Sequence, residues 1–391
     1  MAYTPSTAKT YTLHIPDQAL TDFNQLLKLT PLGPQTYENT QTTHNYGVTY
    51  SWLSSAKDHW QNEFSWRKQE EYINSFPNYT LEVEPGINIH FIGLFSKNKE
   101  AVPIMFMHGW PGSFIEFLPL IEKVKKKYPD PEAMPYHIIV PSLPGYTLSS
   151  GPPMDRDWDL GDTARVMNGL MKQLGFERYL AQGGDLGSFV ATSLVTGFEE
   201  CVGAHQNLFS DLTDLGHEQP DPESLSPLER RALDHAKSVA ATGLGYAIEH
   251  GTRPSTIGFM LSTHPVALLA WTGEKFLEWS DPSTTPSLTE ILTNVTLYWF
   301  TGSFPRSIWP YRIYFGATAG TQKPFPYIEK PFGFSMFPYE LATGLEGVLK
   351  QKTNLVSYRQ HTQGGHFAAL EQPQELWDDV EEFVGKAWST P

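Results

Sequence analysis

The chain is poor in cysteine: Cys201 is the only one among 391 residues. A disulfide bond within the chain is therefore excluded, and we expect a reducing, cytoplasmic compartment. A single cysteine is more often a small buried apolar residue than a nucleophile, and no neighbouring residue in the sequence indicates an activated thiol.

Long apolar runs are also absent. No stretch approaches the roughly 20 apolar residues that a membrane-spanning helix requires. Residues 1–6 are polar and lack the apolar core of a signal peptide. We therefore expect a soluble protein without a membrane anchor.

Basic residues are scarce relative to acidic ones. The chain has 28 Lys and Arg against 43 Asp and Glu, which gives a formal net charge of -15. The densest basic cluster, residues 123–127, is typical of the solvated end of a helix. Because no basic stripe is present, nucleic acid is not an expected partner. A hydrophobic fraction of 40% indicates a globular protein with a sizeable core.

From residue 102 onward, apolar runs alternate with helical patterns. The runs at residues 102–107, 137–140 and 179–182 are typical of strands that are buried on both faces. An amphipathic pattern over residues 157–175 predicts a helix between the second and third of these runs. This alternation predicts an α/β fold with a mostly parallel central sheet.

Two segments depart from the alternation. An aromatic-rich, irregular segment precedes it, and a helical block with two Ser-x-x-Glu capping boxes interrupts it. We interpret the first as a meander that packs on the rest of the chain and the second as an inserted cap. The expected division is a meander at 1–85, the first part of the core at 86–210, the cap at 211–320 and the second part of the core at 321–391.

Residues 183–187, Gly-Gly-Asp-Leu-Gly, place an aspartate between a predicted strand and a predicted helix. A strand that turns directly into a helix over glycines is the nucleophile elbow of α/β-hydrolases. The glycines are needed because the turn is strained and neighbouring backbones approach closely. Asp185 would then attack as a carboxylate and form an ester, which suits an electrophilic sp³ carbon. An ordinary Gly-Asp turn has the same composition, so the interpretation depends on the rest of the chain.

Hydrolysis of such an ester requires a base that activates water. His366 lies in a Gly-Gly-His-Phe segment between the last predicted strand and the last predicted helix, where α/β-hydrolases carry this base. The imidazole must also be oriented through its other nitrogen. Glu340 has the appropriate place in the chain order, while Asp211 and Asp214 remain alternatives.

The tetrahedral intermediate of ester hydrolysis needs aligned N–H donors. Leu186, the residue after the expected nucleophile, supplies one backbone N–H. The turn at residues 108–111, His-Gly-Trp-Pro, follows a predicted strand, and the backbone N–H of Trp110 is the expected second donor.

Four motifs together resemble those of the microsomal-type epoxide hydrolases. They are His-Gly-Trp-Pro-Gly-Ser at 108–113, the aspartate elbow at 183–187, the segment at 332–341 that contains Glu340, and Gly-Gly-His-Phe-Ala-Ala-Leu-Glu at 364–371. The resemblance covers nearly the whole chain, including the meander around Trp66 and Arg67. It implies an α/β-hydrolase fold with a helical cap and a meander, and a soluble member of the family. The implied partners are a small apolar or aryl epoxide and water, without metal or organic cofactor, and a homodimer is left open.

The resemblance also implies two cap tyrosines that bind the epoxide oxygen. Tyr246 matches the first and Tyr311 the second, with Tyr314 as a nearby rival. The chemistry needs such groups, because ring opening produces an alkoxide and a phenol with a pKa of roughly 10 can hydrogen-bond and then protonate it.

Three alternatives compete with epoxide hydrolysis, and the sequence disfavours each of them. A haloalkane or haloacid dehalogenase of the same fold also uses an aspartyl ester, but Leu186 offers no side-chain donor to a halide. A serine esterase is disfavoured, because the nearest match, residues 333–337, lacks the second small residue. A non-catalytic binding protein on this fold has no reason to combine Asp185, Glu340 and His366.

Overall fold

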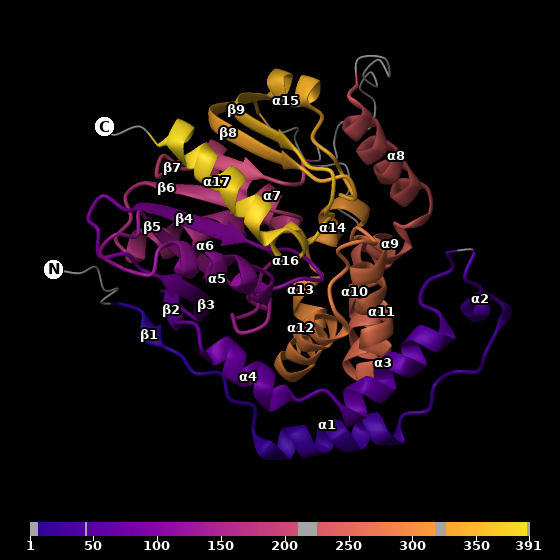
Figure 1. Ribbon diagram of the computed structural model, residues 1–391. Helices are drawn as coiled ribbons and strands as arrows, with labels where there is room; N and C mark the ends of the chain where they lie inside the picture. Colours follow the sequence, from indigo (N-terminus) through magenta and orange to yellow (C-terminus); the bar gives the residue numbers. More distant parts are fainter. Residues whose placement is uncertain (1–6, 44, 210–224, 317–325, 389–391) are drawn as a thin grey trace.

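The computed structural model describes residues 7–43, 45–209, 225–316 and 326–388 (Figure 1). Within these residues, one mixed sheet of nine strands has the order β1-β2-β3-β5-β4-β6-β7-β8-β9. The strands are β1 (Lys9–Thr10), β2 (Asn78–Glu84), β3 (Ile87–Leu94), β4 (Val102–Met107), β5 (Tyr136–Pro141), β6 (Tyr179–Gly183), β7 (Cys201–Gln206), β8 (Ile328–Met336) and β9 (Thr353–Gln360).

The six strands from β5 to β9 in this order pair in parallel, whereas β1, β2 and β3 pair antiparallel at one side of the sheet. Every residue of β4, β5 and β6 is buried, as expected for parallel strands with both faces covered. The predicted α/β fold with a mostly parallel sheet is confirmed.

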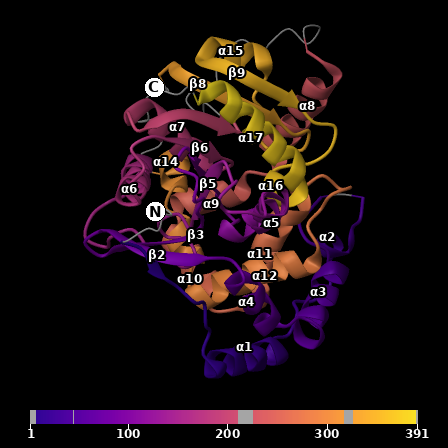
Figure 2. The ribbon, with the colours of Figure 1, turned by 60° about the vertical axis from the view of Figure 1, so that its left-hand side comes forward.

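Helices cover both faces of the sheet and form two separate apolar clusters. Figure 2 shows α6 and α17 on opposite sides of the central strands. On one face lie α6 (Leu160–Gln173) and α7 (Leu186–Gly197), and on the other lie η1 (Phe114–Phe117), α5 (Leu118–Lys127), α16 (Ala368–Glu371) and α17 (Pro373–Ala387), while α15 (Glu346–Lys352) precedes β9.

The helix predicted over residues 157–175 is shorter at both ends. It begins at Leu160 because Asp159 is its N-cap, and the Asp159 carboxylate accepts a hydrogen bond from the N–H of Asp162 at 2.8 Å. It ends at Gln173, ahead of Gly175, whose φ of +85° the helix does not allow.

The cap is inserted between β7 and β8 (Figure 1). The two capping boxes are present at Ser226 and Ser287, where the sequence predicted helix starts. The helices of the cap are α8 (Pro227–Thr242), α9 (Gly245–Thr252), α10 (Pro254–Ser262), α11 (Pro265–Glu278), α12 (Leu288–Thr301), α13 (Phe304–Ser307) and α14 (Tyr311–Phe315).

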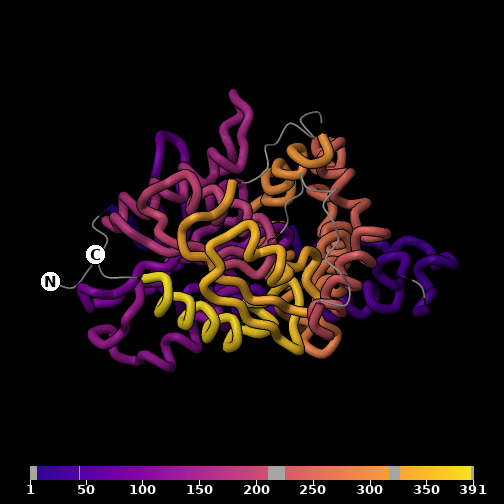
Figure 3. The backbone as a smooth tube through the Cα atoms, turned by 90° about the horizontal axis from the view of Figure 1, so that it is seen from above, coloured from indigo at the N-terminus to yellow at the C-terminus, as the bar shows by residue number. Residues whose placement is uncertain are grey.

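After β1, the N-terminal segment leaves the sheet, runs along the cap and returns to the sheet at β2. Its helices are α1 (Asp17–Leu29), α2 (Tyr37–Thr40), α3 (Tyr50–Asn62) and α4 (Trp66–Asn74), and Figure 3 shows the segment around α2 and α3 beyond the cap. Trp60 of α3 packs against Phe23 of α1 with ring centroids 5.3 Å apart, and its indole N–H donates to Thr296 of the cap at 3.0 Å. The meander therefore holds the cap by direct contacts.

The expected division of the chain at residue 85 falls between β2 and β3, although these two strands are hydrogen-bonded to each other. The divisions near residues 210 and 320 lie outside the described residues, so the domain limits stay a prediction. Among the described helices, none combines the length and the apolar character of a membrane span. Cys201 is buried at the start of β7, and burial raises the pKa of its thiol to about 12.

Candidate active site

Asp185 lies in a strained turn between β6 and α7. Its φ is +46° and its ψ is -128°, a conformation that costs a non-glycine residue about 1–3 kcal/mol. Two glycines make room for the turn. A Cβ on Gly187 would lie 2.2 Å from the carbonyl oxygen of Met107, and one on Gly109 would lie 2.0 Å from Oδ1 of Asp185. The predicted strand–turn–helix geometry of a nucleophile elbow is present.

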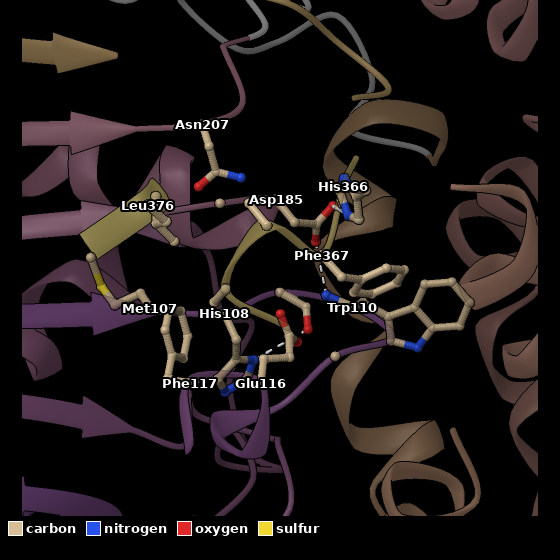
Figure 4. A pocket seen from close by; sticks show the side chains of 15 residues that line it. Met107, His108, Trp110, Glu116, Phe117, Asp185, Asn207, His366, Phe367 and Leu376 are labelled. Atoms are coloured by element: carbon tan, nitrogen blue, oxygen red, sulfur yellow. Dashed lines mark hydrogen bonds and ion pairs between the residues drawn. The ribbon is translucent and has the colours of Figure 1, made fainter. Parts of the chain in front are cut away.

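The carboxylate of Asp185 has two polar neighbours. The backbone N–H of Trp110 donates to its Oδ1 at 2.8 Å, and Nε2 of His366 lies 3.3 Å from its Oδ2 (Figure 4). Leu186 is the first residue of α7, where a backbone N–H has no acceptor within the helix. Trp110 and Leu186 thus have N–H groups at this turn, and their role as oxyanion donors stays a prediction.

His366 follows β9 and is held by a second carboxylate. Its Nδ1 lies 2.6 Å from Oε1 of Glu340, which is buried in the loop after β8 and also accepts the N–H of Leu341 at 2.6 Å. Burial lowers the pKa of His366, but the charges of Glu340 and Asp185 outweigh it and hold this pKa well above its usual range. Asp211 and Asp214, the alternative acids, lie outside the described residues.

The His366 loop is bound to a loop of the cap, residues 279–284. The N–H of His366 donates to the carbonyl oxygen of Trp279 at 2.9 Å, and the N–H of Gly364 donates to Asp281 at 3.0 Å. In return, Glu371 accepts the N–H of Asp281 at 2.9 Å. Burial raises the pKa of Glu371 to about 7. These contacts join the core and the cap beside the catalytic centre.

Tyr246 and Tyr311 come from two cap helices, α9 and α14, and meet with ring centroids 5.6 Å apart. The ring of Tyr246 stacks on that of Trp110, with centroids 5.2 Å apart and an angle of 14° between the ring planes. Burial and the charge of Asp185 raise the pKa of Tyr246. Burial, followed by nearby charges that include Asp185, raises that of Tyr311. Both phenols are therefore neutral at physiological pH and available as donors.

Tyr314 lies elsewhere in the same region. Its ring packs against Phe189 of α7 with centroids 5.7 Å apart, whereas Tyr311 contacts Tyr246 and Trp110. Burial and then the charge of Asp185 raise the pKa of Tyr314 as well. The contacts of Tyr311 thus favour it over Tyr314 as the partner of Tyr246.

Glu116 is a further titratable residue of the site that the sequence reasoning missed. It lines the same cavity as Asp185, Trp110 and His366 (Figure 4), and its Oε1 accepts the N–H of Ser113 at 2.8 Å. Burial raises its pKa to about 8. In the sequence, the spacing of Ser113 and Glu116 is typical of a capping box at a helix start, and the structure contains this capping box. The sequence pattern therefore does not indicate that Glu116 lines the site.

An aspartate at a nucleophile elbow, a histidine after the last strand and a cap inserted after β7 define an α/β-hydrolase-fold protein. A family model described as "alpha/beta hydrolase fold" matches residues 102–204, and one described as "Epoxide hydrolase N terminus" matches residues 8–117. The second match covers the meander and the strands that lead to the turn at Trp110.

Proteins that align with nearly the whole chain are also epoxide hydrolases. Epoxide hydrolase 1 of Oryctolagus cuniculus is 31% identical over 94% of this chain and 87% of its own. The structure of Aspergillus niger epoxide hydrolase has a TM-score of 0.91 at 46% identity and covers 99% of this chain and 98% of that one. Juvenile hormone epoxide hydrolase from the silkworm Bombyx mori has a TM-score of 0.84 at 27% identity, over 97% and 94% of the two chains. The chain belongs to the epoxide hydrolase family, which confirms the resemblance found in the motifs.

Proposed function

We propose that this chain hydrolyses small apolar or aryl epoxides to vicinal diols through an ester of Asp185. The observation that carries the proposal is the position of the Asp185 carboxylate. It lies 3.3 Å from Nε2 of His366 and takes a hydrogen bond from the Trp110 N–H, and its charge is one cause of the raised pKa of both cap phenols.

In the first half-reaction, an oxygen of Asp185 attacks one epoxide carbon and the bond from that carbon to the ring oxygen breaks. Tyr246 and Tyr311 hydrogen-bond the ring oxygen, and a phenol transfers its proton to it. The product is a hydroxyalkyl ester of Asp185. Both phenols carry the proton that this step needs, because burial holds the pKa of each above its ordinary value.

In the second half-reaction, His366 takes a proton from water, and the hydroxide attacks the acyl carbon of the ester. The N–H groups of Trp110 and Leu186 stabilise the resulting oxyanion. The acyl–oxygen bond then breaks, and the imidazolium of His366 gives its proton to the leaving oxygen, so the diol leaves with an oxygen that came from Asp185. The remaining proton returns to the phenolate formed in the first half-reaction, and the carboxylate is restored. Glu340, 2.6 Å from Nδ1, orients the imidazole and stabilises its charged form.

Isotope transfer in a single turnover tests the mechanism. Styrene oxide is mixed with excess enzyme in ¹⁸O-water, and the mass of the diol from the first turnover is measured by mass spectrometry. The ester route gives an unlabelled diol, because its new oxygen comes from Asp185. Labelled oxygen in that first diol would contradict the ester. Halide release from a haloalkane without any diol would favour the dehalogenase, and binding without turnover would favour a binding protein.

We also propose a cytoplasmic location, with a homodimer as a candidate assembly. The single buried cysteine supports a reducing compartment. Cell fractionation tests the location, and light scattering of the purified chain tests the assembly.

A further inference from the structure

A buried ammonium lies against one of the two cap phenols. Lys275, on α11, is only 4% exposed, and its Nζ lies 4.6 Å from the centroid of the Tyr246 ring. Trp279 and Trp271 lie farther away, at 5.9 and 6.0 Å. A lysine is rarely this buried, and the nearest of its three aromatic contacts is the tyrosine proposed to act as the acid.

Lys275 interacts with two carboxylates, Glu274 and Glu278; burial and then the charge of Glu274 raise the pKa of Glu278, whereas the charge of Lys275 lowers it. The ion-pair partner Glu274 is the preceding residue on the same helix, and the Glu274 side chain is 27% exposed against 5% for Lys275. Water therefore screens the carboxylate more than the ammonium. Burial, followed by the charge of Lys275, lowers the pKa of His250 to about 3, so the field of Lys275 reaches α9, the helix that carries Tyr246.

The other groups that face Tyr246 add little positive charge. His250 is neutral, accepts the indole N–H of Trp271 at 2.9 Å and meets Tyr246 edge-on at 5.4 Å. Tyr311 is neutral as well, and Asp185 is negative. Glu278 and His235 line the same cleft as Tyr246, Glu274 and Lys275. The burial that lowers the pKa of His235 keeps that ring neutral. Lys275 is thus the cation closest to the phenol among the described groups around it.

We propose that Lys275 is a positioning residue for epoxide ring opening that acts through Tyr246. As the bond from carbon to the ring oxygen breaks, Tyr246 gives its proton to that oxygen and becomes a phenolate. The ammonium over the ring stabilises the charge that spreads into it. The proton released when the Asp185 ester is hydrolysed later restores the phenol. This inference rests on the proposed function, and it concerns the first half-reaction only.

Step-resolved kinetics separate this role from a structural one. Mixing excess enzyme with styrene oxide gives the rate of ester formation from the mass of the intact protein, and the decay of the ester gives the rate of hydrolysis. We expect K275M to slow ester formation about tenfold and to leave hydrolysis unchanged. We expect K275R, which keeps the charge, to restore ester formation to within a few-fold of the parent.

A double-mutant cycle with Y246F supplies the sharpest control. If Lys275 acts through Tyr246, K275M has no further effect on ester formation in the Y246F background. The inference is overturned if K275M slows ester formation equally in both backgrounds, or if it slows both half-reactions by the same factor. A parent protein that forms no ester would instead contradict the proposed function.

E274Q tests the ion pair itself and serves if K275M does not fold. It removes the carboxylate and keeps the ammonium, so we expect ester formation to be unchanged or faster. A loss in E274Q that matches the loss in K275M would assign the effect to the ion pair and overturn the inference.

Discussion

The core side and the cap side of the site are built by different forces. On the core side, Asp185, His366, Glu340 and the N–H of Trp110 are linked by polar contacts of 2.6–3.3 Å. On the cap side, the rings of Tyr246, Tyr311, His250 and Trp279 pack against one another with centroids roughly 5 Å apart. The ammonium of Lys275 lies over the ring of Tyr246.

The difference matches the tasks that the two sides perform in the proposed reaction. Nucleophilic attack and water activation require atoms aligned within a few tenths of an ångström, which short hydrogen bonds provide. Holding an epoxide oxygen near an apolar substituent requires donors in a dry aromatic wall, which ring packing provides. Changes to the nucleophile and the base should therefore abolish steps, whereas changes on the cap side should slow them.

The largest expected effect is on the core side, at Asp185. D185N keeps the size of the side chain and an oxygen that can accept the Trp110 N–H, but it removes the nucleophile. We expect kcat to fall at least about 10⁴-fold with no ester in the intact-protein mass spectrum. A variant that retained more than a hundredth of the activity would show that Asp185 is not the nucleophile.

His366→Gln should abolish the second step and spare the first. Without the base, the ester forms and stays, because water is not activated, and turnover falls about 10³-fold or more. The intact protein then gains the mass of one substrate. If H366Q turned over without accumulating ester, another base would serve the site.

The core side was the more predictable of the two from sequence, for a physical reason. A buried parallel strand, an elbow and its glycines are local patterns, so Asp185 and the order Asp185, Glu340, His366 are visible in the chain. The cap side depends on how helices far apart in sequence pack. Among 18 tyrosines, Tyr246 and Tyr311 stood out only through the family resemblance.

Two charged groups show what local patterns cannot reveal. Lys275 lies between Glu274 and Phe276 on a helix, and such a lysine usually points to solvent. Its burial results from the surrounding cap residues Tyr246, Trp271 and Trp279. Glu116 forms a capping box with Ser113, and only the tertiary fold turns the same side chain toward the cavity.

On the cap side, removal of either phenol should slow ring opening without stopping it. We expect Y246F and Y311F each to reduce the rate of ester formation about 10–100-fold, and the double variant about 10³-fold, with ester hydrolysis unchanged. Y314F is the matched control, and we expect it to stay within a few-fold of the parent. A loss in Y314F that exceeded the loss in Y311F would exchange the two assignments.

Glu340→Gln should reveal the electrostatics of the core side through pH. Glu340 and Asp185 raise the pKa of His366 in the resting protein, and esterification removes the charge of Asp185. The ester decays only when His366 is neutral, so its decay rate rises with pH up to the pKa of His366 in the ester. Removal of the second carboxylate should lower that midpoint and reduce the plateau about tenfold. A midpoint that moved upward would contradict this electrostatic role.

The smallest effect is expected where the two sides are joined, at Glu371. Its carboxylate accepts the N–H groups of Asp281 and Phe367 and the hydroxyl of Thr284, at 2.9–3.0 Å. E371Q places an amide NH₂ against at least one of these donors, which costs about 1–3 kcal/mol of the free energy of unfolding. Ester decay should slow a few-fold, because the His366 loop is less firmly held, while ester formation is spared.

The stability difference between the parent and E371Q should also depend on pH. Burial raises the pKa of Glu371 from 4.5 to about 7 in the folded protein. The folded state therefore favours the protonated carboxyl of Glu371. The resulting contribution to the free energy of unfolding is fully present below about pH 4.5 and is lost as pH rises through about 7. The advantage of the parent over E371Q in thermal unfolding should be larger at pH 5 than at pH 8. An advantage that grew with pH would mean that the carboxylate, rather than the protonated carboxyl, holds the core and the cap together.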